Sequence, residues 1–394
     1  MRLNGRASDF LAVASLILLA CVLSFHYWQR QPAWTNDGLF YAAQTLEVRG
    51  SSEQAALRAV FRGPPASMLR ARERATGSPR EQRITDPHWV QYSAKFYRRR
   101  WLVPVFAAGL YPLFGLRAVE LVSLLGYVLA GVFLFGLLRL RFSVRVAFLV
   151  AAVCLTLPSF RTWSFVPLTD SWGVALEAAA IASAVLTLRR GAVFLPAWFL
   201  SVGALSLTRD AAFLIVAAAG WLLISHPSTR RTLLVLTGLA AALPTPLLLG
   251  APLKEQLSWA FDGYHIPNST SWTSLLHQYG PHLSDWVTQD LRVHFVLVFV
   301  FLLALFALWI PRGSRDEFLD LVRASALLSI GYLAIVPVYT DFRLELALLP
   351  MVAVGMALWA TLESSPLRRL VPRGTHGSIR RAGAAEPLAQ PDGE

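Results

Sequence analysis

Long apolar segments recur along the whole of this 394-residue chain and constrain its fold more than any other feature. Hydrophobic residues make up 55% of the sequence and charged residues only 15%, where an average soluble domain has about 25% charged residues. Inside a bilayer, segments of this length must satisfy their own backbone hydrogen bonds, which helices do. The sequence therefore predicts an all-α, polytopic helical membrane protein.

Ten segments are assigned as membrane spans. The first, Phe10–Trp28, lacks a small-residue cleavage site and is interpreted as a retained helix rather than a signal peptide. The others cover approximately residues 118–138, 146–160, 171–188, 191–208, 211–225, 232–250, 292–311, 322–340 and 343–362. We predict one transmembrane domain over residues 1–362, with outer loops at 29–117 and 251–291. A disordered cytoplasmic tail rich in Gly, Pro, Arg and Ala is expected at residues 363–394.

Arginines in the short loops set the expected orientation, because such loops remain on the inner side of a membrane. The segment Trp101–Gly115 leaves two topologies open, since it is apolar but short and contains two prolines. If it spans, the loop with Arg139, Arg141 and Arg145 falls outside; if it lies at the interface, that loop falls inside. The positive-inside rule favours the second topology, so Trp101–Gly115 is predicted to be a juxtamembrane helix.

Composition also excludes some classes of partner. The net charge is +12, but the arginines are scattered at segment ends, where they would meet lipid headgroups; we therefore expect no nucleic acid. Cys21 and Cys154 lie within apolar segments and indicate neither a disulfide framework nor a metal site. His265, His277 and His282 have no ordered ligand spacing. We predict no metal and no cofactor.

The predicted orientation gathers charged residues at the outer face of the membrane: Asp37, Asp170, Arg209, Asp210, Asp341 and Arg343. Each has a plain structural explanation. The three acids that precede or open helices could act as N-caps, and Arg343 could pair with Asp341 or with a lipid phosphate. Their concentration beneath a long amphipathic loop nevertheless indicates a functional site.

Such a set suits glycosyl transfer from a lipid-linked phosphosugar. A carboxylate can take the proton from the acceptor hydroxyl, and arginines can neutralise the departing phosphate through bidentate hydrogen bonds. The transition state would be oxocarbenium-like, as in glycoside hydrolysis, and a phosphate leaving group does not strictly require a general acid. Apolar grooves would hold the polyprenyl chain in the plane of the membrane.

Several short motifs follow one another in a characteristic order, namely Asp37-Gly38-Leu39-Phe40-Tyr41, Tyr97-Arg98-Arg99-Arg100-Trp101-Leu102-Val103-Pro104, Leu113-Phe114-Gly115, Pro167-Leu168-Thr169-Asp170, Leu207-Thr208-Arg209-Asp210 and Phe342-Arg343. In these motifs the chain resembles the GT-C superfamily of polyprenyl-phosphate-sugar-dependent glycosyltransferases. That superfamily includes the protein O-mannosyltransferases and the lipid A aminoarabinose transferases. Many of its members have a second acid directly after the first, where this chain has Gly38.

The resemblance implies that Asp37 is the catalytic base. The residues expected to bind the substrate are Tyr41, Arg99, Arg100, Asp170, Arg209, Asp210, His265 and Arg343. The expected enzyme is an inverting hexosyl- or pentosyltransferase with a polyprenyl-phosphate sugar as donor and a lipid, glycan or protein hydroxyl as acceptor. The scarcity of lysine beside arginine indicates a bacterial origin, hence a location in the inner membrane with the site on the periplasmic side.

Two other classes of function stay open at this point. A transporter or flippase of a lipid-linked or anionic solute would need ionisable groups within its spans, and Glu120 and Glu177 are such groups. A non-catalytic membrane scaffold would tolerate the loss of the Asp37 carboxylate. The aromatic residues of the loop 251–290 fit either a membrane-interface belt or a platform for a sugar ring.

Overall fold

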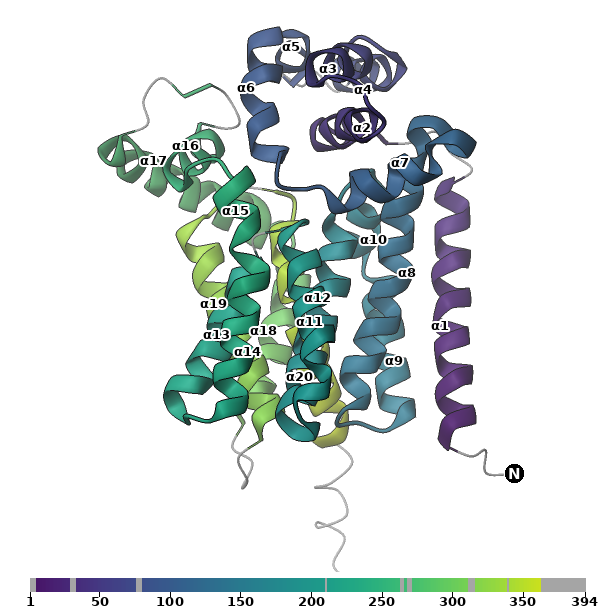
Figure 1. Ribbon diagram of the computed structural model, residues 1–394, viewed down its shortest axis with the longest axis vertical. Helices are drawn as coiled ribbons and strands as arrows, with labels where there is room; N and C mark the ends of the chain where they lie inside the picture. Colours follow the sequence, from purple (N-terminus) through teal and green to yellow (C-terminus); the bar gives the residue numbers. More distant parts are fainter. Residues whose placement is uncertain are drawn as a thin grey trace, which may run out of the picture.

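The computed structural model describes residues 5–28, 33–75, 80–209, 211–262, 266–267, 271–310, 316–338 and 340–362, and within these ranges the regular elements are helices. Figure 1 shows a bundle of helices that run along the long axis of the molecule, with a smaller group of helices across one end. This arrangement confirms the all-helical class that the apolar segments predict. The predicted disordered tail lies outside the described residues.

The bundle consists of the helices α1 (Gly5–Trp28), α8 (Ala118–Arg139), α9 (Val144–Thr156), α10 (Pro158–Ser164), α11 (Asp170–Arg190), α12 (Leu195–Ser206), α13 (Ala211–Ser225), α14 (Thr229–Ala242), α15 (Pro244–Leu249), α18 (Phe295–Trp309), α19 (Glu317–Ile335) and α20 (Leu349–Leu362). Short helical turns η1 (Gly115–Arg117), η2 (Ala192–Phe194) and η4 (Leu344–Leu348) precede α8, α12 and α20. Helix α11 is the central element, because it packs against α8, α12, α13, α14 and α19. Helix α1 stands at the outer edge, against α8 and α9.

Two groups of helices cover the end of the bundle that is uppermost in Figure 1, which we call the capped end. The first group, the helical cap, consists of α2 (Asn36–Val48), α3 (Glu53–Phe61), α4 (Pro64–Ala75), α5 (Arg80–Thr85) and α6 (Pro87–Tyr97). The second consists of α16 (Leu253–Phe261), α17 (Trp272–Asp285) and the π-helical turn η3 (Trp286–Leu291). The two predicted outer loops are therefore largely helical and lie at the same end.

Contacts between α6 and α16 join these two groups. Phe96 stacks on Trp259 with ring centroids 4.6 Å apart, and Lys95 forms an ion pair with Glu255. Trp259 also meets the ring of Tyr97 edge to face at 6.0 Å. Trp259, one of the aromatic residues of the second outer loop, therefore packs against the helical cap. Neither a membrane-interface belt nor a sugar platform requires this contact.

The helix α7 (Leu102–Phe114) corresponds to the predicted juxtamembrane helix within one residue at each end. Helices α7, η1 and α8 form a continuous helical stretch of 38 residues, which would be about 57 Å long if straight, whereas a bilayer with its headgroups is about 40–45 Å thick. The stretch is not straight, because Gly115 adopts φ 57° and ψ −144° between α7 and η1. In Figure 1, α7 lies across the top of the bundle while α8 runs through it.

The predicted count of ten spans is not supported. In the described residues, six helical segments are long and apolar enough to cross a membrane: Arg6–Phe25, Leu102–Arg139, Asp170–Arg190, Thr229–Leu249, Glu317–Ile335 and Leu344–Thr361. Two bent pairs raise the number to eight if each is one span. They are Val144–Thr156 with Pro158–Ser164, bent by 65°, and Trp272–Leu291 with Phe295–Trp309, bent by 94°. The remaining two predicted spans are the shorter apolar helices Ala192–Ser206 and Ala211–Ser225.

Close packing of α18 against α20 offers a test of the fold. A Cβ at Gly355 of α20 would overlap the backbone of Ala304 in α18, whereas a Cβ at Gly331 of α19 would meet no atom within 4 Å. We expect Gly355→Ala to reduce the stability of the protein in detergent by about 1–3 kcal/mol, through overpacking. Gly331→Ala is the matched control and should be neutral or stabilising by up to about 1 kcal/mol. Equal melting temperatures for both variants would contradict this packing.

Candidate functional site

The start of α2 places Asp37 at the junction between the helical cap and the bundle. Thr35 is the N-cap of α2, because its Oγ1 accepts a hydrogen bond of 3.1 Å from the Gly38 amide. Asp37 is therefore not the cap, contrary to one of the explanations left open by the sequence. Its carboxylate is free to contact residues outside its own helix.

Gly38 allows α2 to approach the loop that precedes α11. A Cβ at this position would lie 2.9 Å from the carbonyl oxygen of Pro167 and 3.2 Å from the Pro167 Cβ. A second acid after Asp37 would not fit here without a shift of the backbone. Close packing thus accounts for a glycine, rather than a second acid, directly after Asp37.

The Asp37 carboxylate is held by three side chains from two distant parts of the chain. Its Oδ1 accepts a hydrogen bond of 2.7 Å from the Tyr97 hydroxyl. Its Oδ2 lies 2.9 Å from Nη2 of Arg343 and 4.0 Å from Nη1 of Arg100. The Asp37 side chain is 20% exposed, so it is mostly but not completely buried.

Arg343 bridges Asp37 to a second acid, Asp170. Its Nε donates to Oδ1 of Asp170 over 2.9 Å. Asp170 opens α11 and is fully buried, and it also forms an ion pair with Arg209. The carboxylate does not cap α11 through a side-chain hydrogen bond, although its position at the helix N-terminus is electrostatically favourable. Likewise, Arg343 pairs with these two acids and not with Asp341.

Arg209 approaches α11 where that helix has no side chain. A Cβ at Gly173, three residues after Asp170, would lie 2.8 Å from Cδ of Arg209. The glycine therefore gives the arginine side chain a path to the buried carboxylate. Arg209 is only 12% exposed in this position.

Arg100 contributes a third guanidinium on the side of the helical cap. Its Nη1 donates a hydrogen bond of 3.0 Å to the Tyr41 hydroxyl, which lies 3.4 Å from Oγ1 of Thr169. The guanidinium also lies 5.5 Å from the centroid of the Tyr97 ring. Its Nε is buried and has no hydrogen-bond partner among the described residues.

We call this group the Asp37 cluster; it consists of Asp37, Tyr41, Tyr97, Arg100, Asp170, Arg209 and Arg343. Burial by itself raises the pKa of Asp37, but the charges of Arg343 and Arg100 and the hydrogen bond from Tyr97 outweigh it, so the pKa is lowered. Asp37 is therefore ionised at neutral pH. With all groups charged, the guanidiniums exceed the carboxylates by one. An uncompensated positive charge in a largely buried site favours an anionic ligand.

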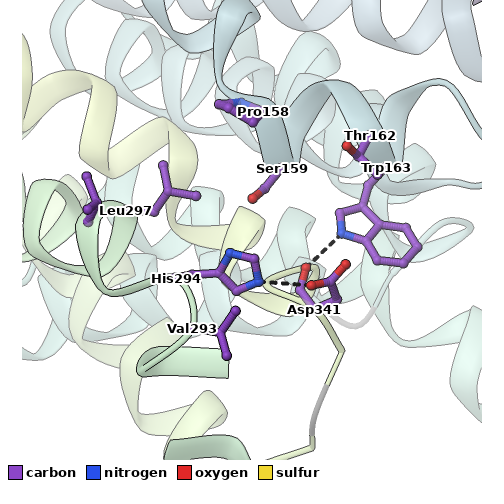
Figure 2. A pocket seen from close by; sticks show the side chains of 9 residues that line it. Pro158, Ser159, Thr162, Trp163, Val293, His294, Leu297 and Asp341 are labelled. Carbon is purple, nitrogen blue, oxygen red and sulfur yellow. Dashed lines mark hydrogen bonds and ion pairs between the residues drawn. The ribbon is translucent and has the colours of Figure 1, made fainter. Parts of the chain in front are cut away.

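A pocket of about 330 Å³ lies beside the cluster; it is lined by Pro158, Ser159, Thr162, Trp163, Val293, His294, Val296, Leu297 and Asp341. Both bent helix pairs change direction here, at α9–α10 and at η3–α18. Figure 2 shows Asp341 between His294 and Trp163. Its Oδ1 lies 2.9 Å from Nε2 of His294, and its backbone carbonyl accepts a hydrogen bond of 3.0 Å from Trp163 Nε1.

Trp163 connects the pocket to the cluster. The guanidinium of Arg343 lies 5.4 Å from the centroid of the Trp163 ring, within the range of a cation–π contact. The walls contributed by Val293, Val296 and Leu297 are apolar, and the first two side chains are mostly exposed. The pocket thus combines polar lining residues, among them His294 and Asp341, with apolar walls, and it lies next to the positively charged Arg343.

The structure brings together most of the predicted site residues, namely Asp37, Tyr41, Arg100, Asp170, Arg209 and Arg343. Arg99 is half-buried beside Arg100, and in the described residues it is not among the arginines that contact Asp37 or Asp170. Asp210 and His265 lie outside the described residues. Within the described ranges, no group of three His, Cys, Asp or Glu side chains could hold a metal ion.

Sequence reasoning did not assign a site role to Tyr97, Thr169 or Trp163. Tyr97 heads the Tyr-Arg-Arg-Arg motif, so its position could have drawn attention to it. Thr169 likewise lies in the quoted motif Pro167-Leu168-Thr169-Asp170. Trp163 of α10 carries no such signal, because its contacts with Asp341 and Arg343 are tertiary.

No protein-family model matches the chain, and a search of curated proteins found no relative.

The ionisation of Asp37 should depend on Arg343. Loss of that charge removes the largest influence that lowers the pKa of Asp37, so we expect this pKa to rise in Arg343→Gln. Infrared spectra recorded during a pH titration, with Asp37→Asn in each background to identify the band, measure this pKa. In the parent protein, stability contributed by Asp37 is present above the ordinary pKa and lost as the pH falls through the lowered one. An Asp37 pKa unaffected by Arg343→Gln would contradict the described contact.

Proposed function

We propose that this protein is an integral membrane glycosyltransferase that moves a sugar from a polyprenyl-phosphate donor to an acceptor hydroxyl. One observation carries the proposal: a partly accessible carboxylate, Asp37, lies among guanidiniums that exceed the nearby acids in charge. A base and an anion site side by side are what this reaction needs. The order of GT-C-like motifs along the sequence agrees with this assignment.

In the proposed mechanism, the donor phosphate contacts Arg100, Arg209 and Arg343. The acceptor oxygen attacks the anomeric carbon, its proton passes to the Asp37 carboxylate, and the bond between the anomeric carbon and the phosphate oxygen breaks. The electron pair of that bond leaves with the polyprenyl phosphate, whose added negative charge the guanidiniums stabilise. Attack opposite to the departing phosphate would invert the anomeric configuration.

The ion pairs of Asp37 give this mechanism an order of events. While Arg343 and Arg100 face Asp37, its pKa is low and the carboxylate is a weak base. A phosphate that engages the same guanidiniums offsets their charge, and the pKa of Asp37 then rises. Donor binding would thus make Asp37 a stronger base at the point when the acceptor proton must be removed.

The pocket in Figure 2 supplies a place for the first part of the lipid chain. Its apolar walls continue onto the outer face of α18, where Phe295, Phe299 and Leu302 are largely exposed. A prenyl chain in the pocket would keep its phosphate near Arg343 and the remainder of the chain against α18. In a bacterium, the capped end would face the periplasm, as the arginine-bearing loops predict.

Transport of an anionic or lipid-linked solute is the alternative, and one observation favours it. Glu177 lies in α11, two turns below Asp170, is 1% exposed, and its Oε2 has no hydrogen-bond partner in the described part of the chain. Buried acids of this kind occur in transport pathways. Glu120, the other acid considered, pairs with Arg117 at 3.5 Å near the start of α8 and gives no such support.

The role of Asp37 can be tested with Asp37→Asn, which preserves the shape of the side chain but removes the base. We expect sugar transfer from a panel of polyprenyl-phosphate sugars to fall by about 100-fold or more, the usual contribution of a general base. Asp86→Asn is a matched control, because Asp86 is the N-cap residue of α6 on the surface of the helical cap and asparagine is an equally good N-cap residue.

Two outcomes would count against the proposal. Full transfer by Asp37→Asn would exclude Asp37 as the base. Absence of transfer by the parent protein with every donor, together with uptake into liposomes that Glu177→Gln abolishes, would favour transport.

A further inference from the structure

The turn that precedes Arg343 has a backbone conformation that its residues do not favour. Asp341 has φ 56° and Phe342 has φ 59°, so two successive residues with side chains adopt the left-handed region. Glycine populates this region freely, whereas a bulky residue such as Phe rarely does. A conformation of this kind persists only where surrounding contacts impose it.

Asp290 supplies the contacts that impose this conformation. Its Oδ2 accepts a hydrogen bond of 2.8 Å from the Thr340 amide, and its Oδ1 accepts one of 2.7 Å from the Phe342 amide. Asp290 is fully buried and lies in the π-helical turn η3, 50 residues or more before the turn it holds. One carboxylate therefore fixes both ends of the strained segment.

Neighbouring contacts hold the same turn from its other sides. The ring of Phe342 is 1% exposed and lies 5.2 Å from that of Phe301 in α18. The side chain of Asp341 contacts His294 in the pocket of Figure 2, and Thr340 Oγ1 accepts a hydrogen bond from the Leu344 amide. These contacts fix the backbone on both sides of Arg343 and so the direction in which its side chain extends.

That direction matters because Arg343 must meet two separate carboxylates. Its Nη2 lies 2.9 Å from Asp37 on the helical cap, and its Nε lies 2.9 Å from Asp170 at the start of α11. A change in the turn would move the Arg343 backbone and break one or both contacts. The mechanism proposed above does not use Asp290, which touches neither of these acids among the contacts of the described residues.

We propose that Asp290 is a positioning residue: by accepting hydrogen bonds from the Thr340 and Phe342 amides, it holds the left-handed turn that aims Arg343 at Asp37 and at the donor phosphate. The effect on Arg343 follows from the structure alone, whereas the effect on sugar transfer rests on the proposed function. A carboxylate is required because both of its oxygens accept. Asparagine would place an NH₂ donor against one of the two backbone donors.

The test uses the full-length protein in lipid nanodiscs and the variant Asp290→Asn, with Asp285→Asn as matched control. Asp285 is an exposed acid five residues earlier, whose carboxylate accepts a hydrogen bond from Gln289 on its own helical segment. Hydrogen exchange over residues 340–346, followed by mass spectrometry, should be at least about 10-fold faster in Asp290→Asn, because a buried amide loses its acceptor. Asp285→Asn should exchange like the parent protein.

Two further readouts separate positioning from a general loss of structure. In Asp290→Asn, the infrared-detected pKa of Asp37 should rise as it does in Arg343→Gln, because the guanidinium is no longer held beside the carboxylate. Exchange in helices away from the turn should stay at the parent level, because the lost hydrogen bonds are confined to the amides of Thr340 and Phe342. A general loosening of the bundle would raise exchange in those helices as well.

The results distinguish the two proposals. Unchanged exchange at 340–346, or faster exchange with an unchanged Asp37 pKa, would overturn the role of Asp290, whatever the protein does. Faster exchange and a raised pKa in a protein that transfers no sugar would support the positioning role while the proposed function fails. If the parent protein transfers sugar, we expect Asp290→Asn to reduce kcat/KM for the donor by about 10-fold or more, and equal values would contradict the link to Arg343.

Discussion

The double ion pair of Arg343 is the interaction on which the capped end depends. It joins Asp37 of the helical cap to Asp170 of the central helix α11, and it comes from the segment that leads into η4 and α20. Asp170 is fully buried, and an unpaired carboxylate in such surroundings would be very unfavourable. The relative positions of the helical cap, α11 and the last helix are therefore linked through one guanidinium.

Several features around this interaction favour function over stability. Replacing a buried ion pair by apolar residues often leaves a protein as stable or makes it more stable, so the cluster is not explained by stability alone. The left-handed turn at Asp341 and Phe342 is a further unfavourable element at the same place. Local departures from preferred geometry tend to occur where a site must be held ready for a ligand. An excess of positive charge in a largely buried site favours an anionic ligand over a cationic one.

Much of this arrangement follows from the sequence, and the rest depends on contacts between distant segments. Apolar segments indicate helices because their length and composition are local properties, and in the described residues each predicted span consists mainly of helix. The count of ten spans is not supported, because two apolar segments form helices shorter than a span and two others are sharply bent, and apolar composition alone reveals neither property. Orientation by the arginine loops was sufficient to group Asp37, Asp170, Arg209 and Arg343. It could not give the pairing of Arg343 with both acids, the capping of α2 by Thr35 or the hold of Asp290 on residues 340–342, since these are tertiary contacts.

The central claim is that the Asp37 cluster binds the phosphate of a polyprenyl lipid, and binding to the full-length protein measured by native mass spectrometry from nanodiscs tests it most directly. We expect polyprenyl phosphate to bind more tightly than the uncharged polyprenol. Arg343→Gln should weaken phosphate binding by about 10- to 100-fold, the worth of one hydrogen bond to a charged group. Arg98→Gln is the control, because Arg98 pairs with Glu53 on the exposed side of the cap. Equal binding of the phosphate and the alcohol, or binding unaffected by Arg343→Gln, would contradict the account.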